Sequence, residues 1–144
     1  MAVVTVIMLT LTNIVATTLI ATSSAMSHAD IKDYLVEQSI QQGVSPELVL
    51  YMAENESHFR LQAIGDMDIT CPHTGKPVRS RGIFQISECW YPEITDQEAF
   101  SLASSTAFAL SHIKKSKQWC MSQWTTCRAY FKSYPHRQVS FFRE

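Results

Sequence analysis

The feature that most constrains this chain is an acidic side chain on the apolar face of a short amphipathic helix. The helix is predicted to begin after Ser45, which can cap it, with Pro46 in its first turn. At about 100° of rotation per residue, Glu56 falls inside an apolar stripe. The stripe is formed by Leu48, Val49, Met52 and Ala53. Glu54 points the opposite way on the same helix, so these two nearby acids are expected to have different surroundings.

A glutamate held against apolar side chains is costly in its charged form. Its pKa is therefore expected to rise from about 4.3 toward neutrality, which would make Glu56 a proton donor at physiological pH. The alternative is that the helix ends near Asn55, which would leave Glu56 in a solvated turn as an ordinary surface acid. The helix alone does not decide between these two interpretations.

Three short sequence blocks follow one another in this part of the chain. They are Glu56-Ser57-His58-Phe59, Ala63-Ile64-Gly65 and Ser80-Arg81-Gly82-Ile83-Phe84-Gln85-Ile86. In this order they resemble the signature blocks of the lysozyme-like superfamily, in particular soluble lytic transglycosylase domains and goose-type lysozymes. The resemblance covers roughly residues 31–132. It implies a mainly α-helical, lysozyme-like domain with a loop or small β-hairpin insert flanking a sugar-binding cleft.

The resemblance also implies roles for individual residues. Glu56 would be the catalytic acid. The residues implied for substrate binding are Ser57, Ser80, Gly82, Gln85 and Tyr130. Tyr130 belongs to this set because Ala129-Tyr130-Phe131 is similar to a block of lytic transglycosylases that has asparagine where Phe131 stands. The alternatives are a turn glycine at position 82, a capping hydroxyl at position 57 and a core aromatic at position 130.

The implied reaction is cleavage of the MurNAc-GlcNAc bond of peptidoglycan. A lytic transglycosylase needs one acid/base residue and forms a 1,6-anhydro product, whereas hydrolases usually add a second carboxylate. Asp66 and Asp68 are the only acids between Glu56 and Gln85, in a loop where aspartate is common for backbone reasons. The transglycosylase is therefore favoured. The alternatives are a hydrolase that uses Asp66 or Asp68, and a non-catalytic glycan-binding or assembly component.

Residues 1–29 contain no Lys, Arg, Asp or Glu. An apolar, threonine-rich run from Val3 to Ile20 precedes small residues, which is typical of a secretory signal peptide cleaved after Ala25 or Ala29. An uncleaved N-terminal membrane anchor is the alternative, although the threonines make a poor bilayer span. We expect export to the periplasm or the extracellular space, a domain at residues 30–134 and a short tail at residues 135–144.

Four cysteines agree with export into an oxidising compartment. A Cys71–Cys89 bridge would clamp the insert to the loop that carries Gln85, and a Cys120–Cys127 bridge would close a turn. The second bridge is excluded if both residues lie on one unbroken helix, since seven residues rise about 10 Å, so Cys89–Cys127 is an alternative. Cys71, His73 and Cys89 lack the spacing of a metal site, and no metal or cofactor is expected.

The amino-acid composition limits which classes of partner this chain is expected to bind. Twelve basic and thirteen acidic residues give a net charge of -1, which does not indicate nucleic-acid binding. With 46% hydrophobic residues, the chain can bury the core of one domain. We expect a monomer that binds peptidoglycan glycan strands.

Trp90, Trp119 and Trp124 could stack on sugars, but three tryptophans in a small helical domain are more often core residues.

Three further helices and one loop are predicted. A first helix runs from Ile31 to about Gln42, capped by Asp30 and stopped by Gly43. A capping box of Thr95 and Glu98 opens a long helix that ends near Lys115. Its predicted inward stripe is Phe100, Ala103, Ala107 and Leu110. A last helix spans residues 122–132, and residues 62–79 form a loop or small hairpin.

Overall fold

The computed structural model describes residues 26–135, which form six helices and one three-stranded sheet. The helices are α1 (His28–Gln42), α2 (Pro46–Ser57), α3 (Asp96–Phe100), α4 (Leu102–Ile113), α5 (Lys117–Gln123) and α6 (Thr125–Ser133). The strands are β1 (Ile64–Gly65), β2 (Ser80–Arg81) and β3 (Ile86–Ser87). The expectation of a mainly α-helical domain with a small β insert is confirmed. Residues 1–25 of the predicted signal segment and residues 136–144 of the predicted tail lie outside the described residues, and α1 begins at His28, before the predicted domain start at residue 30.

The first two helices begin and end at strong local signals. Ser27, and not Asp30, caps α1, because Ser27 and Asp30 accept hydrogen bonds from each other's backbone N–H groups and so satisfy two donors instead of one. Gly43 ends α1 with a left-handed φ of 66°. Ser45 caps α2 as predicted, by accepting a hydrogen bond from Leu48 N.

The predicted long helix is in fact two helices, α3 and α4, which meet at Ser101. The capping box predicted at its start is present. Ser101 leaves helical geometry, with ψ at 126°, and its hydroxyl accepts the hydrogen bond that starts α4. The break shifts the phase of the buried face. The predicted stripe is therefore partly wrong: Leu110 is buried and Phe100 half-buried, but Ala103 and Ala107 are exposed.

The predicted last helix, at residues 122–132, overlaps α6 and only the last two residues of α5, and these two helices meet at Trp124. This residue has extended backbone geometry, and its indole Nε1 donates a 2.9 Å hydrogen bond to a carbonyl of the β2–β3 turn. Cys120 and Cys127 therefore lie on different helices, and they form a disulfide with their Cα atoms 6.0 Å apart. Cys71 and Cys89 form the other bridge, with Cα atoms 5.6 Å apart.

Removal of the two disulfides is expected to reduce stability in the order of the loops that they close. The Cys71–Cys89 bridge spans 18 residues and the Cys120–Cys127 bridge spans 7. Chain entropy then predicts losses of about 3 and about 2 kcal/mol for the paired Cys→Ser variants. Urea unfolding of each variant measures both losses. Equal losses, or a larger loss from the shorter loop, would contradict the entropic explanation.

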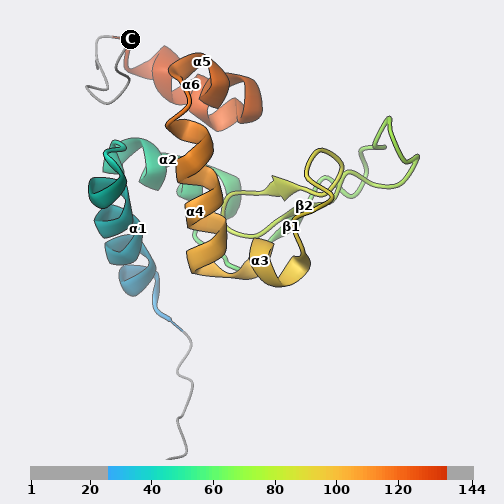
Figure 1. Cartoon of the computed structure of the whole chain (residues 1–144), viewed down its shortest axis with the longest axis horizontal. Coiled ribbons are helices and arrows are strands. Elements are labelled where there is room, and N and C mark those ends of the chain that lie inside the picture. The colour runs from blue at the N-terminus through green and yellow to red at the C-terminus, as the bar shows by residue number, and fades with distance from the viewer. Residues whose placement is uncertain (1–25, 136–144) are drawn as a thin grey trace, which may run out of the picture.

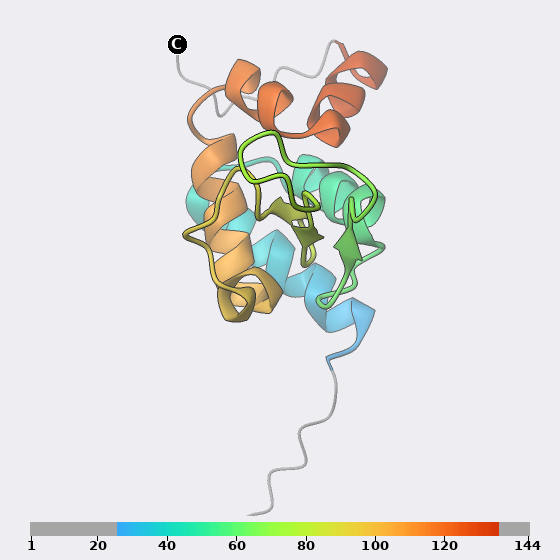
Figure 2. The ribbon, with the colours of Figure 1, turned by 90° about the vertical axis from the view of Figure 1, so that its right-hand side faces the viewer.

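The small sheet carries a long excursion of the chain. Its order is β1-β2-β3, with Arg81 opposite Ile64 on one side and Ile86 on the other. Residues 66–79, here called the insert, extend from this sheet away from the helices at the right of Figure 1, and they face the viewer in Figure 2. A bridge between Thr70 and Pro77 pairs the two arms of the insert.

The core lies between the helices and the β2–β3 turn. Fully buried apolar residues include Leu35, Leu48, Val49, Met52, Ile83, Phe84, Ile86, Leu110 and Ile113. Helix α2 packs against α1 and also against α6. This arrangement brings the last turn of α2, which carries Glu56, close to the start of α6. Within residues 26–135, no helix is long and apolar enough to cross a bilayer.

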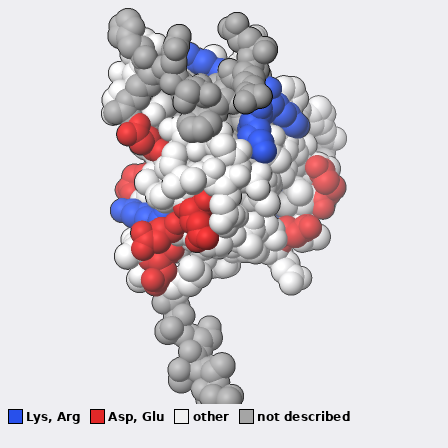
Figure 3. Space-filling view, turned by 60° about the vertical axis from the view of Figure 1, so that its left-hand side comes forward, with Lys and Arg blue, Asp and Glu red and all other residues white. Residues whose placement is uncertain are grey.

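Charge is distributed unevenly along the chain. Residues 99–134 contain five basic residues and no Asp or Glu, whereas residues 30–98 contain twelve acids and five basic residues. The five are Lys114, Lys115, Lys117, Arg128 and Lys132. On the face drawn in Figure 3, a basic cluster in the upper part is separate from a larger acidic cluster at the lower left. The net charge of -1 is therefore the sum of an acidic region and a basic region, which produce local electrostatic potentials of opposite sign.

Candidate active site

Glu56 occupies the position that its helical phase predicts. Helix α2 continues through Ser57, so the interpretation in which it ends near Asn55 is wrong. Glu56 is half-buried, whereas Glu54 is exposed and lies 3.2 Å from the Nδ1 atom of His58 at the helix end. The two acids of this helix therefore have the different surroundings that the sequence indicated.

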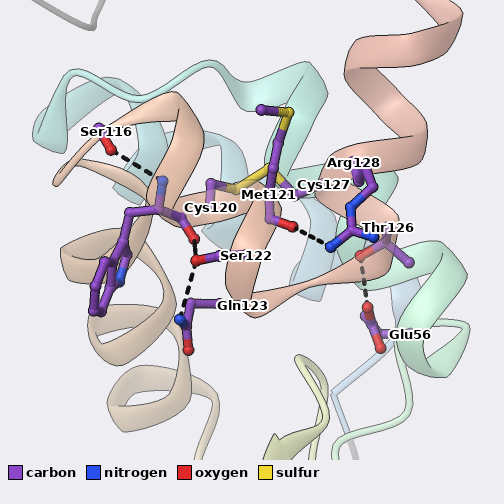
Figure 4. Close-up of a disulfide and its surroundings, with 10 residues drawn as sticks. Glu56, Ser116, Cys120, Met121, Ser122, Gln123, Thr126, Cys127 and Arg128 are labelled. Carbon is purple, nitrogen blue, oxygen red and sulfur yellow. Dashed lines mark hydrogen bonds between the residues drawn. A yellow bond between two sulfur atoms is a disulfide. The ribbon is translucent and has the colours of Figure 1, made fainter.

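The surroundings of Glu56 favour its protonated form. Burial raises the pKa of the carboxyl above its ordinary value, and the negative charge of Asp66 adds to this shift. A hydrogen bond opposes both effects: the hydroxyl of Thr126 donates to Glu56 Oε1 at 2.5 Å (Figure 4). Burial is the largest of the three effects, so the net direction is upward. Thr126 holds one carboxyl oxygen and leaves Oε2 to carry a proton.

Glu56 lines an open pocket of about 290 Å³. The other lining residues are Asp66, Val78, Ser80, Gln85, Ser87, Trp90, Gln123, Trp124 and Thr125. They come from the insert, from the strands β2 and β3 with their turn, and from the α5–α6 junction. Polar side chains with one exposed aromatic ring suit a polyhydroxylated ligand better than an apolar one. We call this the Glu56 pocket.

The pocket brings together four of the residues that the sequence singled out. Besides Glu56 they are Asp66, Ser80 and Gln85. The hydroxyl of Ser80 donates a hydrogen bond to the Asp66 carboxylate. Gln85 Nε2 donates to the carbonyl of Gly82 at 2.9 Å, so this side chain braces its own loop. A Cβ at position 65 would lie 2.4 Å from Gln85 Oε1, so any larger residue there would require the Gln85 side chain to move.

Ser57 and Gly82 lie behind the pocket and do not line it. Ser57 is buried, and its hydroxyl bonds to the carbonyl of Ile83 at 2.9 Å, which ties the end of α2 to the β2–β3 turn. Gly82 has a φ of +74°, and a Cβ at this position would lie 1.9 Å from the carbonyl oxygen of Ala99. Both residues therefore position the loop, whereas the resemblance implied contact with substrate.

Tyr130 and Asp68 are also not brought to the pocket. Tyr130 is buried, and its hydroxyl lies 3.5 Å from Glu47 Oε2. Glu47 is in the first turn of α2 and Glu56 in the last, so nine residues place them about 13.5 Å apart along the axis. Tyr130 is thus a core aromatic, the alternative that the sequence left open. Asp68 is exposed on the insert and outside the pocket lining, so of the two candidate second carboxylates only Asp66 lines the pocket.

An ion-pair network fixes the strand that carries Ser80. Arg79 bonds to Glu88 at 2.8 Å and to Asp96, at the start of α3, at 2.7 Å. The buried Arg81 bonds to the same Asp96 at 2.9 Å. These arginines hold the pKa of the Asp96 carboxyl well below its usual range. The network therefore anchors β2 to α3 from the two residues that flank Ser80.

Sequence reasoning missed the contribution of the α5–α6 junction. Gln123 and Thr125 line the pocket, and Thr126 bonds to Glu56. A continuous helix over residues 122–132 was predicted, and it would not present this junction to the end of α2. The consecutive threonines at the start of α6 carry no recognisable motif, so only the packing of α6 on α2 identifies them.

Comparisons with known proteins do not assign this site. No family model, curated protein or solved structure matches the chain. In the part of the chain that the structure describes, no three His, Cys, Asp or Glu residues are grouped so as to hold a metal ion. A functional assignment therefore depends on the sequence blocks and on the Glu56 pocket.

The raised pKa of Glu56 leads to a pH-dependent effect on stability. Because the folded state binds the proton more tightly than the unfolded state, stability falls as pH rises from the ordinary pKa of 4.5 through the folded-state pKa. Glu56→Gln cannot ionise and removes this loss. The variant is therefore expected to have a higher Tm than the parent at pH 7, and the difference should shrink toward pH 4. Thermal unfolding at the two pH values measures it, and a pH-independent difference would contradict the burial of a charge.

Proposed function

We propose that this protein is a peptidoglycan lytic transglycosylase that cleaves the MurNAc-GlcNAc bond, with Glu56 as general acid and then general base. The observation that carries the proposal is the half-buried Glu56 carboxyl, with its raised pKa, in a polar open pocket. Such a carboxyl can deliver a proton near neutral pH, which an exposed glutamate does poorly. The similarity of the three sequence blocks to lytic transglycosylases supplies the substrate class.

The reaction requires one proton to move twice. Protonated Glu56 donates its proton to the glycosidic oxygen as the bond from that oxygen to C1 breaks, and positive charge develops at C1. The Glu56 carboxylate, accepting the hydroxyl hydrogen bond of Thr126, is stabilised at this stage. It then takes the proton of the sugar's own 6-hydroxyl as O6 attacks C1. The products are a 1,6-anhydro end and a free 4-hydroxyl, and Glu56 is again protonated.

A hydrolase is the second candidate, and Asp66 is the observation that favours it. Asp66 lines the same pocket as Glu56, and its charge affects the pKa of Glu56. In a hydrolase this carboxylate would attack C1 or activate a water molecule. In a transglycosylase it would stabilise the developing positive charge without forming a bond. The hydrogen bond from the Ser80 hydroxyl orients the Asp66 carboxylate, which suits either role.

The location of the substrate agrees with the other proposed properties. Peptidoglycan lies outside the cytoplasm, so the uncharged segment at residues 1–29 would direct export or act as an anchor. Two disulfides suit an oxidising compartment. We propose that the exported protein acts as a monomer on glycan strands, without a cofactor.

Digestion of purified peptidoglycan tests the function. The parent protein, Glu56→Gln and Asp66→Asn are incubated with it, and the released muropeptides are weighed. Anhydro ends, one water lighter than hydrated ends, are expected from the parent and from Asp66→Asn. Hydrated ends from the parent, lost in Asp66→Asn, would instead identify a hydrolase. Binding without any release by the parent would identify a glycan-binding component.

A further inference from the structure

An exposed tryptophan forms one wall of the Glu56 pocket. Trp90 lines this pocket while 57% of its surface is exposed. The pocket volume of about 290 Å³ is at the lower end of the range for small-molecule sites, which is about 300–1,000 Å³. A polymer that presents one bond to Glu56 must therefore extend over the rim, where the indole of Trp90 is accessible.

Several contacts hold Trp90 in place despite its exposure. The preceding residue is Cys89, which is bonded to Cys71 of the insert, and Cys89 N also donates to the carbonyl of Val78 at 3.3 Å. The ring of His73 packs perpendicular to the indole, with centroids 4.6 Å apart and an interplanar angle of 84°. A large aromatic ring that is both exposed and fixed is preorganised for a ligand, because little conformational entropy remains to be lost on binding.

The hydroxyl of Ser87, in the same pocket wall as Trp90, has no hydrogen-bond partner within residues 26–135. Ser87 lines the Glu56 pocket, and its hydroxyl oxygen is buried. Buried hydroxyls are normally hydrogen-bonded, so the Ser87 hydroxyl leaves the pocket wall with a polar group that has no partner within the described residues. This wall of the Glu56 pocket therefore contains the apolar face of the Trp90 ring and, three residues earlier in the chain, the hydroxyl of Ser87.

We propose that Trp90 is the stacking platform for one N-acetylhexosamine ring of the glycan strand whose neighbouring bond is cleaved at Glu56. A pyranose has C–H faces and hydroxyl-bearing edges. Its face matches the indole of Trp90, and its edge groups match Ser87 and Gln123 in the same lining. The inference rests on the proposed glycan-cleaving function and specifies how the strand is held. The insert, through His73 and the Cys71–Cys89 bridge, positions the platform.

Trp119 provides a matched control. It is also exposed, at 40%, but it lies on α5, does not line the Glu56 pocket, and has the Lys115 ammonium 4.8 Å from its ring centroid. Loss of Trp119 therefore removes an exposed indole of the same kind without changing the pocket. A general effect of removing surface tryptophan would appear in both variants.

The test measures binding in the full chain carrying Glu56→Gln, which holds substrate without turnover. Calorimetric titration with chitohexaose, a β-1,4-linked hexamer of N-acetylglucosamine, is performed on this protein with Trp90→Ala, Trp90→Phe or Trp119→Ala added. Trp90→Ala is expected to weaken binding about tenfold, Trp90→Phe to restore most of it, and Trp119→Ala to leave it unchanged. With Glu56 intact, Trp90→Ala should raise KM and change kcat little. Thermal unfolding verifies that each variant is folded.

Three results would overturn the proposal, and they are distinguishable. If the parent cleaves peptidoglycan but Trp90→Ala binds chitohexaose as tightly as the protein with Trp90, the platform is wrong and the proposed function stands. If the parent neither binds chitohexaose nor releases muropeptides, both the platform and the proposed function are wrong. Equal weakening by Trp90→Ala and Trp119→Ala would also exclude a specific platform.

Discussion

Glu56→Gln is expected to lower the rate of muropeptide release by about 10²–10⁴-fold. Gln has nearly the shape of a protonated glutamate and can still accept the Thr126 hydrogen bond, but it cannot donate a proton to the glycosidic oxygen. Affinity for glycan should change little, so the loss should appear in kcat. Release from purified peptidoglycan, measured under single-turnover conditions, gives the rate.

Glu54→Gln is the matched control for this variant. Glu54 lies on the same helix two residues earlier, is exposed, and its carboxylate pairs with the imidazole of His58. Its substitution should leave the rate unchanged.

The parent's kcat should fall as pH rises through the raised pKa of Glu56, because the protonated acid is the active form. A Glu56→Gln variant that retains full activity would remove the basis of the proposed mechanism.

Gly82→Ala is expected to lower the free energy of unfolding by more than about 4 kcal/mol, or to prevent folding. The new Cβ would lie 1.9 Å from the Ala99 carbonyl oxygen and 2.9 Å from its carbonyl carbon, and these backbone atoms cannot move aside as a side chain would. The left-handed φ of +74° adds strain of about 1–2 kcal/mol. Urea unfolding and the yield of soluble protein measure the effect.

Gly75→Ala separates the two causes of this loss. Gly75 also has a left-handed φ, of +69°, but nothing lies within 4 Å of the position that its Cβ would occupy. Its substitution should therefore cost only about 1–2 kcal/mol, from backbone strain alone. Similar losses in Gly75→Ala and Gly82→Ala would show that contact between the β2–β3 turn and α3 contributes little.

Local sequence signals predicted the starts of α2 and α3. Ser45 with Pro46, and Thr95 with Glu98, act through hydrogen bonds within one helical turn, so they are readable from a short window. The breaks at Ser101 and Trp124 were not predicted. Ser101 resembles an ordinary helical serine in sequence. The indole of Trp124 bonds to the carbonyl of Phe84, forty residues away in the chain, and such a contact has no local signal.

The residues of the candidate site likewise include some that the sequence predicted correctly and some that it did not. Helical phase alone indicated that Glu56 faces apolar neighbours and Glu54 does not, and both expectations are confirmed. The sequence blocks pointed to Ser80 and Gln85, which line the pocket. They also pointed to Tyr130, whose position depends on how α6 packs on α2 and which lies at the opposite end of α2 from Glu56.

The sequence by itself determined the mainly helical class, the main capping signals and the inward direction of the Glu56 side chain, because each depends on periodicity or on hydrogen bonds between near neighbours. Only the tertiary structure decided which groups surround that carboxyl. Thr126, Asp66 and Trp90 come from a helix start, an insert and a strand end that are distant in sequence. Their approach follows from the packing of α2 against α6 and from the Cys71–Cys89 bridge, and no local pattern encodes such long-range contacts.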